Sequence, residues 1–328
     1  LIVPGGLVEL RAVAAERGYP GEYRRLAELL DQEANWLSSA LDWRYRSGTS
    51  GKSQVSAQEL PLEWKPGASN GNRWFFRADV ARVNAGAVDL ADSEGSTFGS
   101  VLLCQPACGS GSLAQLEKGV AFSAGLERQD LRVDVGASPA GFAVVNFVGG
   151  LLYRGDLGPL SYSVDASRRP VTSSLLSHSG TTDPNTGRTW GGVVATGVRL
   201  GLAADSGGEY GAWGSLGLHR LGGRNVLDND RAQLMAGGYR RFINEEDRQL
   251  TLGVTGMYWR HSENAGEFTF GHGGYYSPGK YSSLALPVTY GFGTARTSFA
   301  VRASVSVAWS ELERAPYFPT DPGLQAQA

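Results

Sequence analysis

The chain has 328 residues, 46 glycines, 2 cysteines and a formal net charge of -2. This length suits one large β domain or two average domains. The balanced charge argues against nucleic-acid binding, which needs a basic surface. The mildly polar mean hydropathy excludes a helical membrane protein. It is compatible with a membrane β-barrel, where only alternate residues meet lipid.

The N-terminal segment has a helical pattern. Good helix formers fill residues 9–17, a helix could end at Gly18, and Tyr23, Leu26, Leu29 and Leu30 share one helical face further on. We therefore expect residues 1–34 to form a short helical segment. The first residues lack a basic start followed by an apolar run and a cleavage site, so no signal peptide is expected.

From residue 35 onward the apolar residues recur with a period of two, which is typical of β-strands. In one such segment, Trp74, Phe76 and Val80 alternate with Arg73 and Arg77. The predicted strands exceed the roughly 5–6 residues of ordinary strands and reach the about 9–11 needed to cross a membrane. The same alternation occurs in segments 36–46, 131–135, 160–167, 193–202, 213–219, 250–259 and 298–309.

One uncharged stretch, residues 135–153, is long enough for a membrane helix. It contains Gly136, Pro139, Gly141 and Gly149, which disfavour a helix. We expect two strands joined by a Ser-Pro-Ala-Gly turn.

Aromatic residues often end the apolar faces, as in the girdles of outer-membrane barrels. These observations favour an all-β, antiparallel transmembrane β-barrel of about 14 strands over residues 35–328. Short turns are expected on the periplasmic side and longer loops outside, so the loops near 222–230 and 261–279 are external. The region between 65 and 190 does not fit this alternation, which indicates that the strand count is off by one there. The alternation alone also fits a soluble sandwich. The aromatic residues in question are Trp43, Tyr45, Trp64, Tyr258, Tyr290 and Trp309.

The polar face of the strands carries the candidate residues of a substrate path. Such residues line a wet interior if the apolar face meets lipid. Alternatively, many of them form salt bridges that only stiffen the wall. The twelve candidates are Arg44, Arg77, Asp79, Arg132, Asp134, Asp165, Arg199, Trp213, Tyr239, Arg241, Trp259 and Arg302.

Motifs for catalysis are weak. Gly51-Lys52-Ser53 resembles a phosphate-binding loop, but Arg46 stands where the first glycine is required, and strands flank it. His272-Gly273-Gly274 resembles an oxyanion loop, but no Gly-x-Ser-x-Gly motif accompanies it. The four histidines show no metal-ligand spacing. We therefore predict no enzyme, no catalytic residue, no metal and no cofactor.

Cys104 and Cys108 lie in a loop-like stretch. In an oxidising compartment we expect them to form a disulfide. The alternative is two free thiols.

Three separated motifs carry a family resemblance. The segments RSGTSGKSQVSAQELPLEW (46–64), GHGGYYSPGKYSSLALPVTYGF (271–292) and APYFPTDPGLQAQA (315–328) occur in this order. Together they resemble the C-terminal barrel of the cellulose synthase operon protein C family. The resemblance covers most of residues 35–328.

The resemblance implies a barrel of about sixteen strands in the outer membrane of a Gram-negative bacterium. In the full protein a periplasmic array of tetratricopeptide helices precedes it, so residues 1–34 could end that array. Because this chain ends in LQAQA without a strand, we expect a C-terminal truncation of about two strands and an open edge, which promotes aggregation.

The expected function is passive export of a linear exopolysaccharide, cellulose, driven by the inner-membrane synthase. The expected partners are a β-1,4-glucan chain, outer-membrane lipid and the periplasmic part of a cellulose synthase complex, but no nucleic acid. The loop with His272, Tyr275 and Tyr276 is a candidate gate or a packed surface loop. The alternatives are a porin for an alginate-like polymer and a soluble β-rich binding module.

Overall fold

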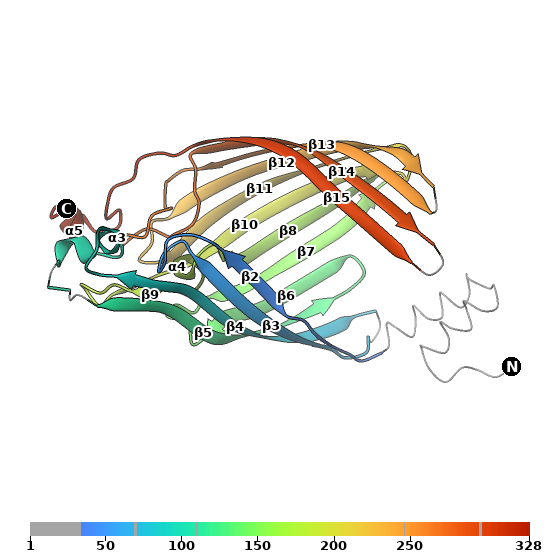
Figure 1. Cartoon of the computed structure of the whole chain (residues 1–328). Coiled ribbons are helices and arrows are strands. Elements are labelled where there is room, and N and C mark those ends of the chain that lie inside the picture. The colour runs from blue at the N-terminus through green and yellow to red at the C-terminus, as the bar shows by residue number, and fades with distance from the viewer. Residues whose placement is uncertain (1–33, 69–70, 106, 109–110, 246, 295–296) are drawn as a thin grey trace.

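A computed structural model describes residues 34–68, 71–105, 107–108, 111–245, 247–294 and 297–328. Residues 1–33, for which a helix is expected, lie outside the described residues. Within the described ranges, a single antiparallel sheet contains 15 strands (Figure 1). The strands are β1 (Trp36–Ser39), β2 (Asp42–Arg46), β3 (Val55–Lys65), β4 (Arg73–Asp89), β5 (Ser112–Glu127), β6 (Leu131–Ala140), β7 (Phe147–Leu157), β8 (Leu160–Pro170), β9 (Thr181–Thr182), β10 (Thr189–Asp205), β11 (Tyr210–Arg224), β12 (Asn229–Asn244), β13 (Arg248–His261), β14 (Lys280–Gly293) and β15 (Ser298–Glu311).

Each long strand pairs with its neighbours in the chain, so the sheet is a meander. Strands β1 and β2 pair with β3 in one continuous register and act as a single interrupted strand. The path through the sheet, which omits β2 and β9, has 13 strands. The all-β antiparallel fold predicted from the sequence is therefore confirmed, and the number of wall strands is close to the expected one.

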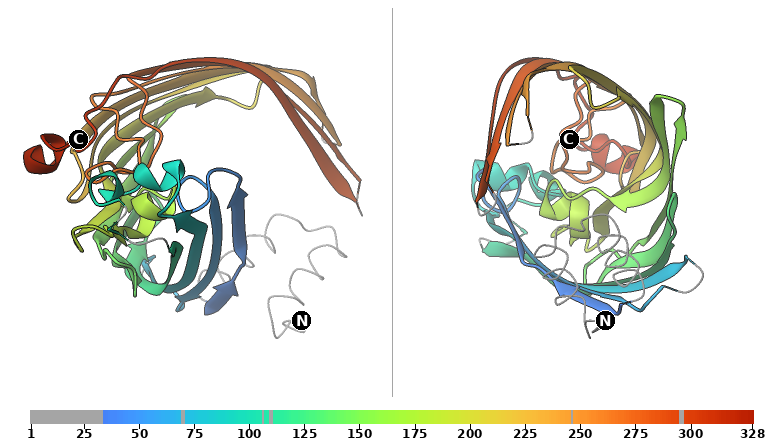
Figure 2. Two further views of the ribbon diagram at one scale, coloured as in Figure 1. Left: turned by 60° about the vertical axis from the view of Figure 1, so that its left-hand side comes forward. Right: turned by 90° about the vertical axis from the view of Figure 1, so that its right-hand side faces the viewer.

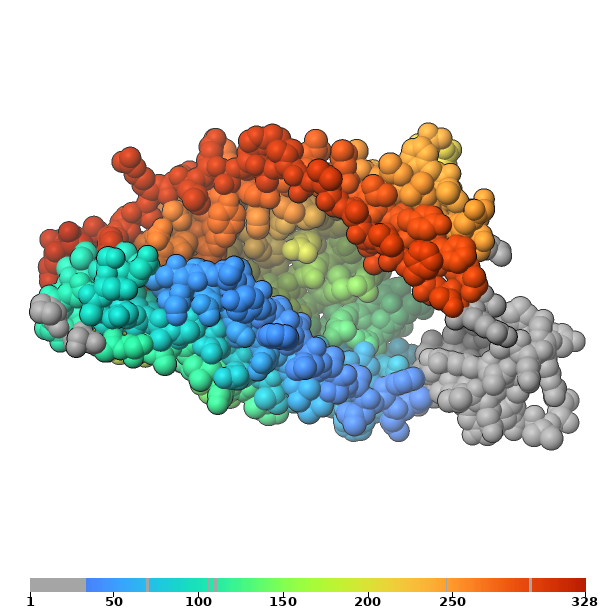
Figure 3. All heavy atoms as spheres, in the orientation of Figure 1, coloured from blue at the N-terminus to red at the C-terminus, as the bar shows by residue number. Residues whose placement is uncertain are grey.

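The sheet curls into an open, barrel-like wall (Figure 2). Strands β1/β2 and β15 stand at the two ends of the strand order and do not pair with each other in the described part of the chain. Every residue of β15 is exposed. The space-filling view shows the opening between these two edges and the hollow behind it (Figure 3).

The hairpin connections differ in length between the two ends of the wall. Short turns at 128–130, 158–159 and 206–209 lie at one end, and the longer connections lie at the other. Helix α4 (Leu175–Ser179) and the short β9 occupy the connection between β8 and β10. This connection adds no strand to the path through the sheet, which agrees with the expectation that the strand count is off by one between residues 65 and 190.

The uncharged stretch 135–153 forms the end of β6 and the start of β7, as expected. The turn, however, covers residues 141–146 rather than the Ser-Pro-Ala-Gly segment. Strand β6 continues through Pro139, which lies next to Ala140 at the end of the ladder with β5. A proline is tolerated there because the ladder shifts register at that end and requires no donor from it.

The two faces of the wall differ in chemistry because side chains alternate along each strand. The outer face is apolar and exposed: Leu252 is 39% exposed, Leu284 47% and Val301 58%. Most of the aromatic residues that end the apolar segments lie on this face with exposures of 40% or more; those are Trp43, Tyr45, Trp64, Tyr258 and Trp309. A soluble module with this face packed into a dry core does not agree with the structure.

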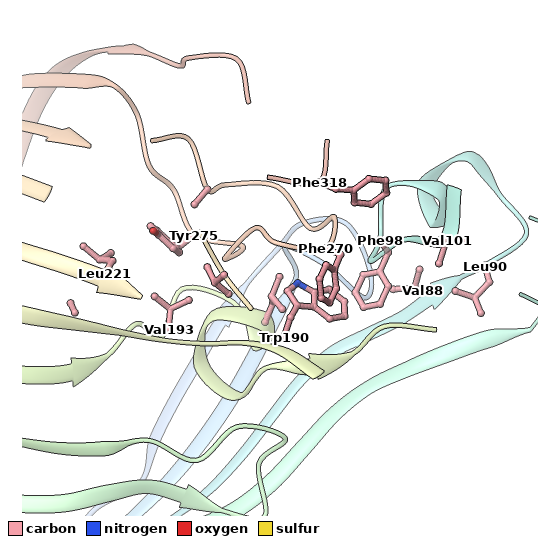
Figure 4. Packing of buried hydrophobic residues seen from close by; sticks show 14 residues of the cluster. Val88, Leu90, Phe98, Val101, Trp190, Val193, Leu221, Phe270, Tyr275 and Phe318 are labelled. Atoms are coloured by element: carbon pink, nitrogen blue, oxygen red, sulfur yellow. The ribbon is translucent and has the colours of Figure 1, made fainter. Parts of the chain in front are cut away.

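The main buried cluster lies on the other, concave face, at the end of the long connections (Figure 4). We call the segments that form it the plug: residues 90–105, 171–188, 262–279 and 312–328, with helices α3 (Ser93–Ser96), α4 and α5 (Pro322–Gln325) and the 3-10 helix η1 (Val101–Leu103). No described helix is long and apolar enough to span a membrane.

Candidate functional site

All twelve candidate path residues lie on the concave face. On β10, Arg199 stands four residues from Ala195, a member of the buried cluster of the plug, and an even spacing keeps both on one face. The register places Arg199 opposite Asp165 of β8. In the ladders from β10 to β15, the partners of Arg199 and the residues at even spacing from them lie on the same face. These residues include Trp213, Tyr239, Trp259 and Arg302.

On the other side of β8, the same concave face can be followed through the ladders from β7 to β2. Residues Asp165 and Arg132 both stand opposite Leu152 of β7 in their respective ladders. The remaining candidates, Asp134, Arg77, Asp79 and Arg44, follow with the same parity through β6, β4 and β2.

Ion pairs tie many of these charges to the wall. Arg77 pairs with Asp79 at 2.8 Å, Arg241 pairs with Asp205 at 2.5 Å, and Arg169 pairs with Asp134 at 2.6 Å. Arg44 pairs with Glu59, and Arg132 with Glu127. Because these groups are partly exposed, the pairs contribute little to stability. Their main effect is to fix the positions of the charges along the concave face.

Four of the carboxylates and guanidinium groups in these pairs do not belong to the predicted set. They are Glu59, Glu127, Arg169 and Asp205. The alternation of the sequence contains the signal for two of them: Arg169 follows Asp165 at an even spacing in β8, and Glu59 alternates with Leu60 and Leu62 in β3. Strand parity could therefore have found them.

One recess in the concave face collects several of the candidates. It has a volume of about 370 Å³ and is lined by Arg77, Asp79, Arg132 and Asp134, with Phe75 and Arg169 beside them. The Arg132 guanidinium lies 4.5 Å from the centroid of the Phe75 ring. The recess thus offers charged donors and acceptors next to an aromatic face.

Other charges on the concave face have no ion-pair partner. Within the described residues, no ion pair or side-chain hydrogen bond holds Asp165, Arg199, Arg231 or Arg302. Asp165 and Arg199 face each other across the β8–β10 ladder, and Arg231 stands one strand beyond His219. These groups are available to exchange hydrogen bonds with a polar ligand.

Aromatic rings on the concave face lie against glycines of the next strand. Trp213 of β11 is opposite Gly237 of β12, where an added Cβ would lie 2.9 Å from the indole. The Tyr239 ring covers Gly211 in the same way. A ring that lies on a neighbouring backbone presents its other face to the interior.

A further aromatic group lies nearer to the plug. The ring of Trp259 is 5.2 Å from Tyr281 and 6.3 Å from Tyr276, measured between centroids. Tyr276 belongs to the plug and is 47% exposed. It is the one residue of the three gate candidates that is not buried.

The other two gate candidates are buried within the plug. His272 is completely buried, and its Nε2 donates a hydrogen bond to the Pro316 carbonyl oxygen at 3.0 Å. The Tyr275 hydroxyl accepts a hydrogen bond from Asn229 Nδ2 at 3.1 Å. Burial lowers the pKa of His272 and raises the pKa of Tyr275 to about 12. Both side chains are therefore neutral at pH 7 and anchor the loop.

Hydrogen bonds join the segments of the plug to one another. Phe270 N donates to the Gly99 carbonyl oxygen at 3.0 Å, and the Tyr317 hydroxyl donates to the Ser96 carbonyl oxygen at 2.8 Å. The Ser100 hydroxyl donates to buried Asp183 at 2.6 Å. The plug is thus one bonded unit rather than a set of separate loops.

Helix α4 connects the plug to both halves of the wall. Ser174 and Ser177 form a capping box, which explains why so short a segment is helical. Leu176 packs in the main cluster with β10 residues, whereas Leu175 packs in a second cluster with β3 and β4. Burial lowers the pKa of His178 to about 4, so this helix is buried without a charge at pH 7.

The predicted weak motifs have structural roles. Gly51, Lys52 and Ser53 lie in the turn between β2 and β3, as expected. The ammonium of Lys52 is buried against α3, where it lies 2.7 Å from Glu94 Oε2. Cys104 and Cys108 are joined by a disulfide next to η1. Over the described ranges, no group of three or more histidine, cysteine, aspartate or glutamate side chains is arranged to hold a metal ion.

Comparison with a solved structure supports the fold. A bacterial polysaccharide outer membrane secretin aligns with a TM-score of 0.57 at 12% identity, over 85% of this chain and 80% of that chain. At this identity the likeness concerns the fold alone.

Comparison with protein sequences identifies the family. Residues 53–328 match the family model of the cellulose synthase operon protein C C-terminus. The cellulose synthase operon protein C of Salmonella typhimurium is 37% identical over 89% of this chain and 25% of its own length. That of Xanthomonas axonopodis pv. citri is 40% identical over 76% of this chain and 17% of its own length. The chain thus spans a quarter or less of these relatives. It belongs to the cellulose synthase operon protein C family.

Proposed function

We propose that the chain forms the wall of an outer-membrane channel that exports a linear exopolysaccharide, cellulose, from the periplasm to the cell surface of a Gram-negative bacterium. The observation that carries this proposal is the separation of the two faces of the wall. The concave face is polar from β2 to β15, and the outer face is apolar and exposed. The names of the relatives support cellulose as the polymer.

The concave face suits a sliding polymer. Sugar rings have apolar C–H faces that stack on Trp and Tyr rings, and their hydroxyls exchange hydrogen bonds with charged side chains. Each such hydrogen bond contributes only about 0.5–1.5 kcal/mol net, because it replaces one to water. Many weak sites in sequence, such as Trp213, Tyr239 and the unpaired Arg199, let a chain move from one to the next.

The plug is proposed to be the closed state of the exit. Longer loops of outer-membrane barrels lie on the extracellular side, so the plug stands at the cell surface. Tyr276, which contacts the aromatic group at Trp259, is the proposed gate residue. His272 and Tyr275 are proposed to hold the gate loop in place.

The channel is proposed to be passive and not an enzyme, with no cofactor. The force on the polymer then comes from its elongation by the inner-membrane synthase. Its partners are the β-1,4-glucan chain, outer-membrane lipid and the periplasmic part of the cellulose synthase complex.

Conductance in planar bilayers tests this function. We expect the protein to form pores whose current is interrupted by cello-oligosaccharides and not by unrelated sugars of similar size. Alginate oligosaccharides are the matched control for an acidic polymer, since the concave face carries charges of both signs. A protein that passes no ions and does not respond to any glucan would refute the proposal. Block by alginate alone would assign the channel to another exopolymer.

A further inference from the structure

A band of basic residues runs along the outer face at the plug end of the wall. On several strands the first outward position beyond the apolar segment is basic. On β4, for example, Arg82 follows Val80, and on β11 Arg220 follows Leu218 at the next outward position. The six basic residues at this level are Arg82, Lys118, Arg168, Arg220, Arg260 and Lys280.

The register of the strands shows that the side chains of this band point to the outer face. Arg82 and Lys118 are opposite each other on β4 and β5, and Arg168, Thr196 and Arg220 form one row across β8, β10 and β11. The neighbours Arg169, Ala195 and Leu221 point to the concave side, where Ala195 and Leu221 join the plug cluster. The acidic residues at or beside this level are Asp228, Asp230 and Glu311, of which Asp228 pairs with Arg220 and Glu311 with Lys280. Positive charge therefore predominates in the band.

One groove in the band has a volume of about 730 Å³. Its lining includes Arg168, Arg220 and Arg224, with Thr196 between the first two, and a single carboxylate, Asp228. Arg220 donates to this carboxylate at 2.8 Å. No ion pair of the described residues involves Arg168 or Arg224. The groove thus keeps two guanidinium groups without a counter-charge.

Hydrogen bonds position the Arg168 guanidinium group but leave some of its N–H donors unused. Arg168 Nε donates to the Phe147 carbonyl oxygen at 3.0 Å, and Nη1 donates to Thr196 Oγ1 at 2.9 Å. A guanidinium group has five N–H donors, so several remain free. Arginine binds phosphate well because its planar fork can donate two parallel hydrogen bonds.

Apolar side chains continue from the groove along the outer face. Val145 in its lining is 52% exposed, and Phe147, whose carbonyl group holds Arg168, is 69% exposed. On β10, Val198, Leu200 and Leu202 follow Thr196 at every second position and are exposed. An occupant with a phosphate and hydrocarbon chains would match both parts. In a membrane protein, basic pockets at this boundary bind lipid head groups.

We propose that this groove, which rests on the proposed outer-membrane location, binds a phosphate group of lipopolysaccharide, the phosphorylated glycolipid of the outer leaflet. Arg168 and Arg224 donate to the phosphate oxygens, and the acyl chains lie on the apolar residues of β10. The rest of the basic band contacts further phosphates around the wall. Binding there fixes the depth and the direction of the wall in the membrane.

Native mass spectrometry of the detergent-solubilised protein tests this site. The probe is lipid A with two phosphates, compared with dephosphorylated lipid A. We expect the double variant Arg168→Gln/Arg224→Gln to retain the phosphorylated probe at least about tenfold less, because charge-assisted hydrogen bonds are lost. Arg128→Gln/Arg240→Gln is the matched control. It removes two arginines near the short-turn end, Arg128 in a turn and Arg240 on the outer face, and should retain the probe like the natural protein.

Several outcomes would overturn the site. Equal retention by the natural protein and the Arg168→Gln/Arg224→Gln variant would do so, as would equal binding of dephosphorylated lipid A. Equal competition by phosphatidylglycerol or by inorganic phosphate would overturn lipopolysaccharide as the occupant. Circular dichroism checks that the variants fold. If the double variant does not fold, Arg224→Gln alone replaces it, because this substitution removes no hydrogen bond of the described residues.

The test separates this site from the proposed export function. The two arginines lie outside the sugar path, so the Arg168→Gln/Arg224→Gln variant should keep its block by cello-oligosaccharides in bilayers. Normal lipid retention without any effect of glucans would refute export while it supports the lipid site. Normal block by glucans with unchanged lipid retention in the variant would refute the lipid site alone.

Discussion

Inward-facing glycines decide where the large side chains of the concave face can lie. An added Cβ at Gly125 would come within 2.4 Å of the Phe75 ring, and one at Gly150 within 2.8 Å of Arg169 Nη2. Gly150 lies on β7, between the strands of Arg169 and Asp134, so its lack of a side chain opens the line between these two ionic partners. Glycine here has a packing role rather than a conformational one.

We predict that Gly237→Val impairs recognition of glucan. The valine side chain would displace the Trp213 indole from the wall, because an added Cβ already comes within 2.9 Å of it. The concentration of cello-oligosaccharide needed for half block in bilayers should rise several-fold. Gly256→Val is the matched control, since nothing lies within 4 Å of an added Cβ there. An equal effect of both substitutions would show that strand packing, and not the indole, is responsible.

At the scale of elements, the plug is held by its own core and by the wall together. Phe270 is completely buried, and its ring centroid lies 5.7 Å from that of Trp190 and 4.5 Å from the Arg188 guanidinium. Its backbone pairs with Gly99 in another segment of the plug. The gate loop therefore cannot move alone without breaking contacts to residues 90–105 and to β10.

We predict that Phe270→Ala loosens the plug and raises the resting ion current. Truncation of a buried phenylalanine costs about 3–5 kcal/mol, which destabilises the closed arrangement. Single-channel recording without sugar measures the current. Leu102→Ala is the control at the same end of the wall, because this leucine is 40% exposed and contributes less to packing. An unchanged current in a correctly folded Phe270→Ala protein would argue against the plug as the closed exit.

At the scale of the whole molecule, the curvature of the sheet gives its two faces different surroundings. The sheet curls around the plug on its concave side (Figure 2). The ladder of charges lies on that side, and the outer side exposes the aliphatic residues. Neighbouring residues of a single strand therefore experience opposite environments. This arrangement is what a wall between lipid and a wet interior requires.

We predict that adjacent substitutions on β13 differ in their effect on membrane insertion. Val254→Arg places a charge on the exposed apolar face, at an expected cost of about 2–4 kcal/mol near the bilayer midplane. Thr255→Arg, on the concave face, should insert normally because the charge faces water. Insertion into liposomes and heat-modifiable gel migration measure the difference. If both variants insert equally well, the outer face does not meet lipid.

Much of the wall could be predicted from the sequence. The alternation of Leu252 and Val254 with Thr251 and Thr255 fixes their faces because side chains in a strand point to opposite sides. The Cys104–Cys108 disulfide was also expected, because both cysteines lie in one loop-like stretch and an oxidising compartment favours their pairing. The ionic partners could not be predicted from the alternation, because the pairing of Arg169 with Asp134 joins strands that are not neighbours.

The amino-acid sequence by itself determined the strands, which residues share a face, and the family, because the first two follow from the local period and the third from motifs. Only the tertiary structure decided that His272 and Tyr275 are buried anchors while Tyr276 remains exposed. It also decided that α4 joins β10 to β3 and β4 through adjacent leucines. The physical reason is that burial in the plug depends on segments far apart in the chain, which meet only when the sheet curls.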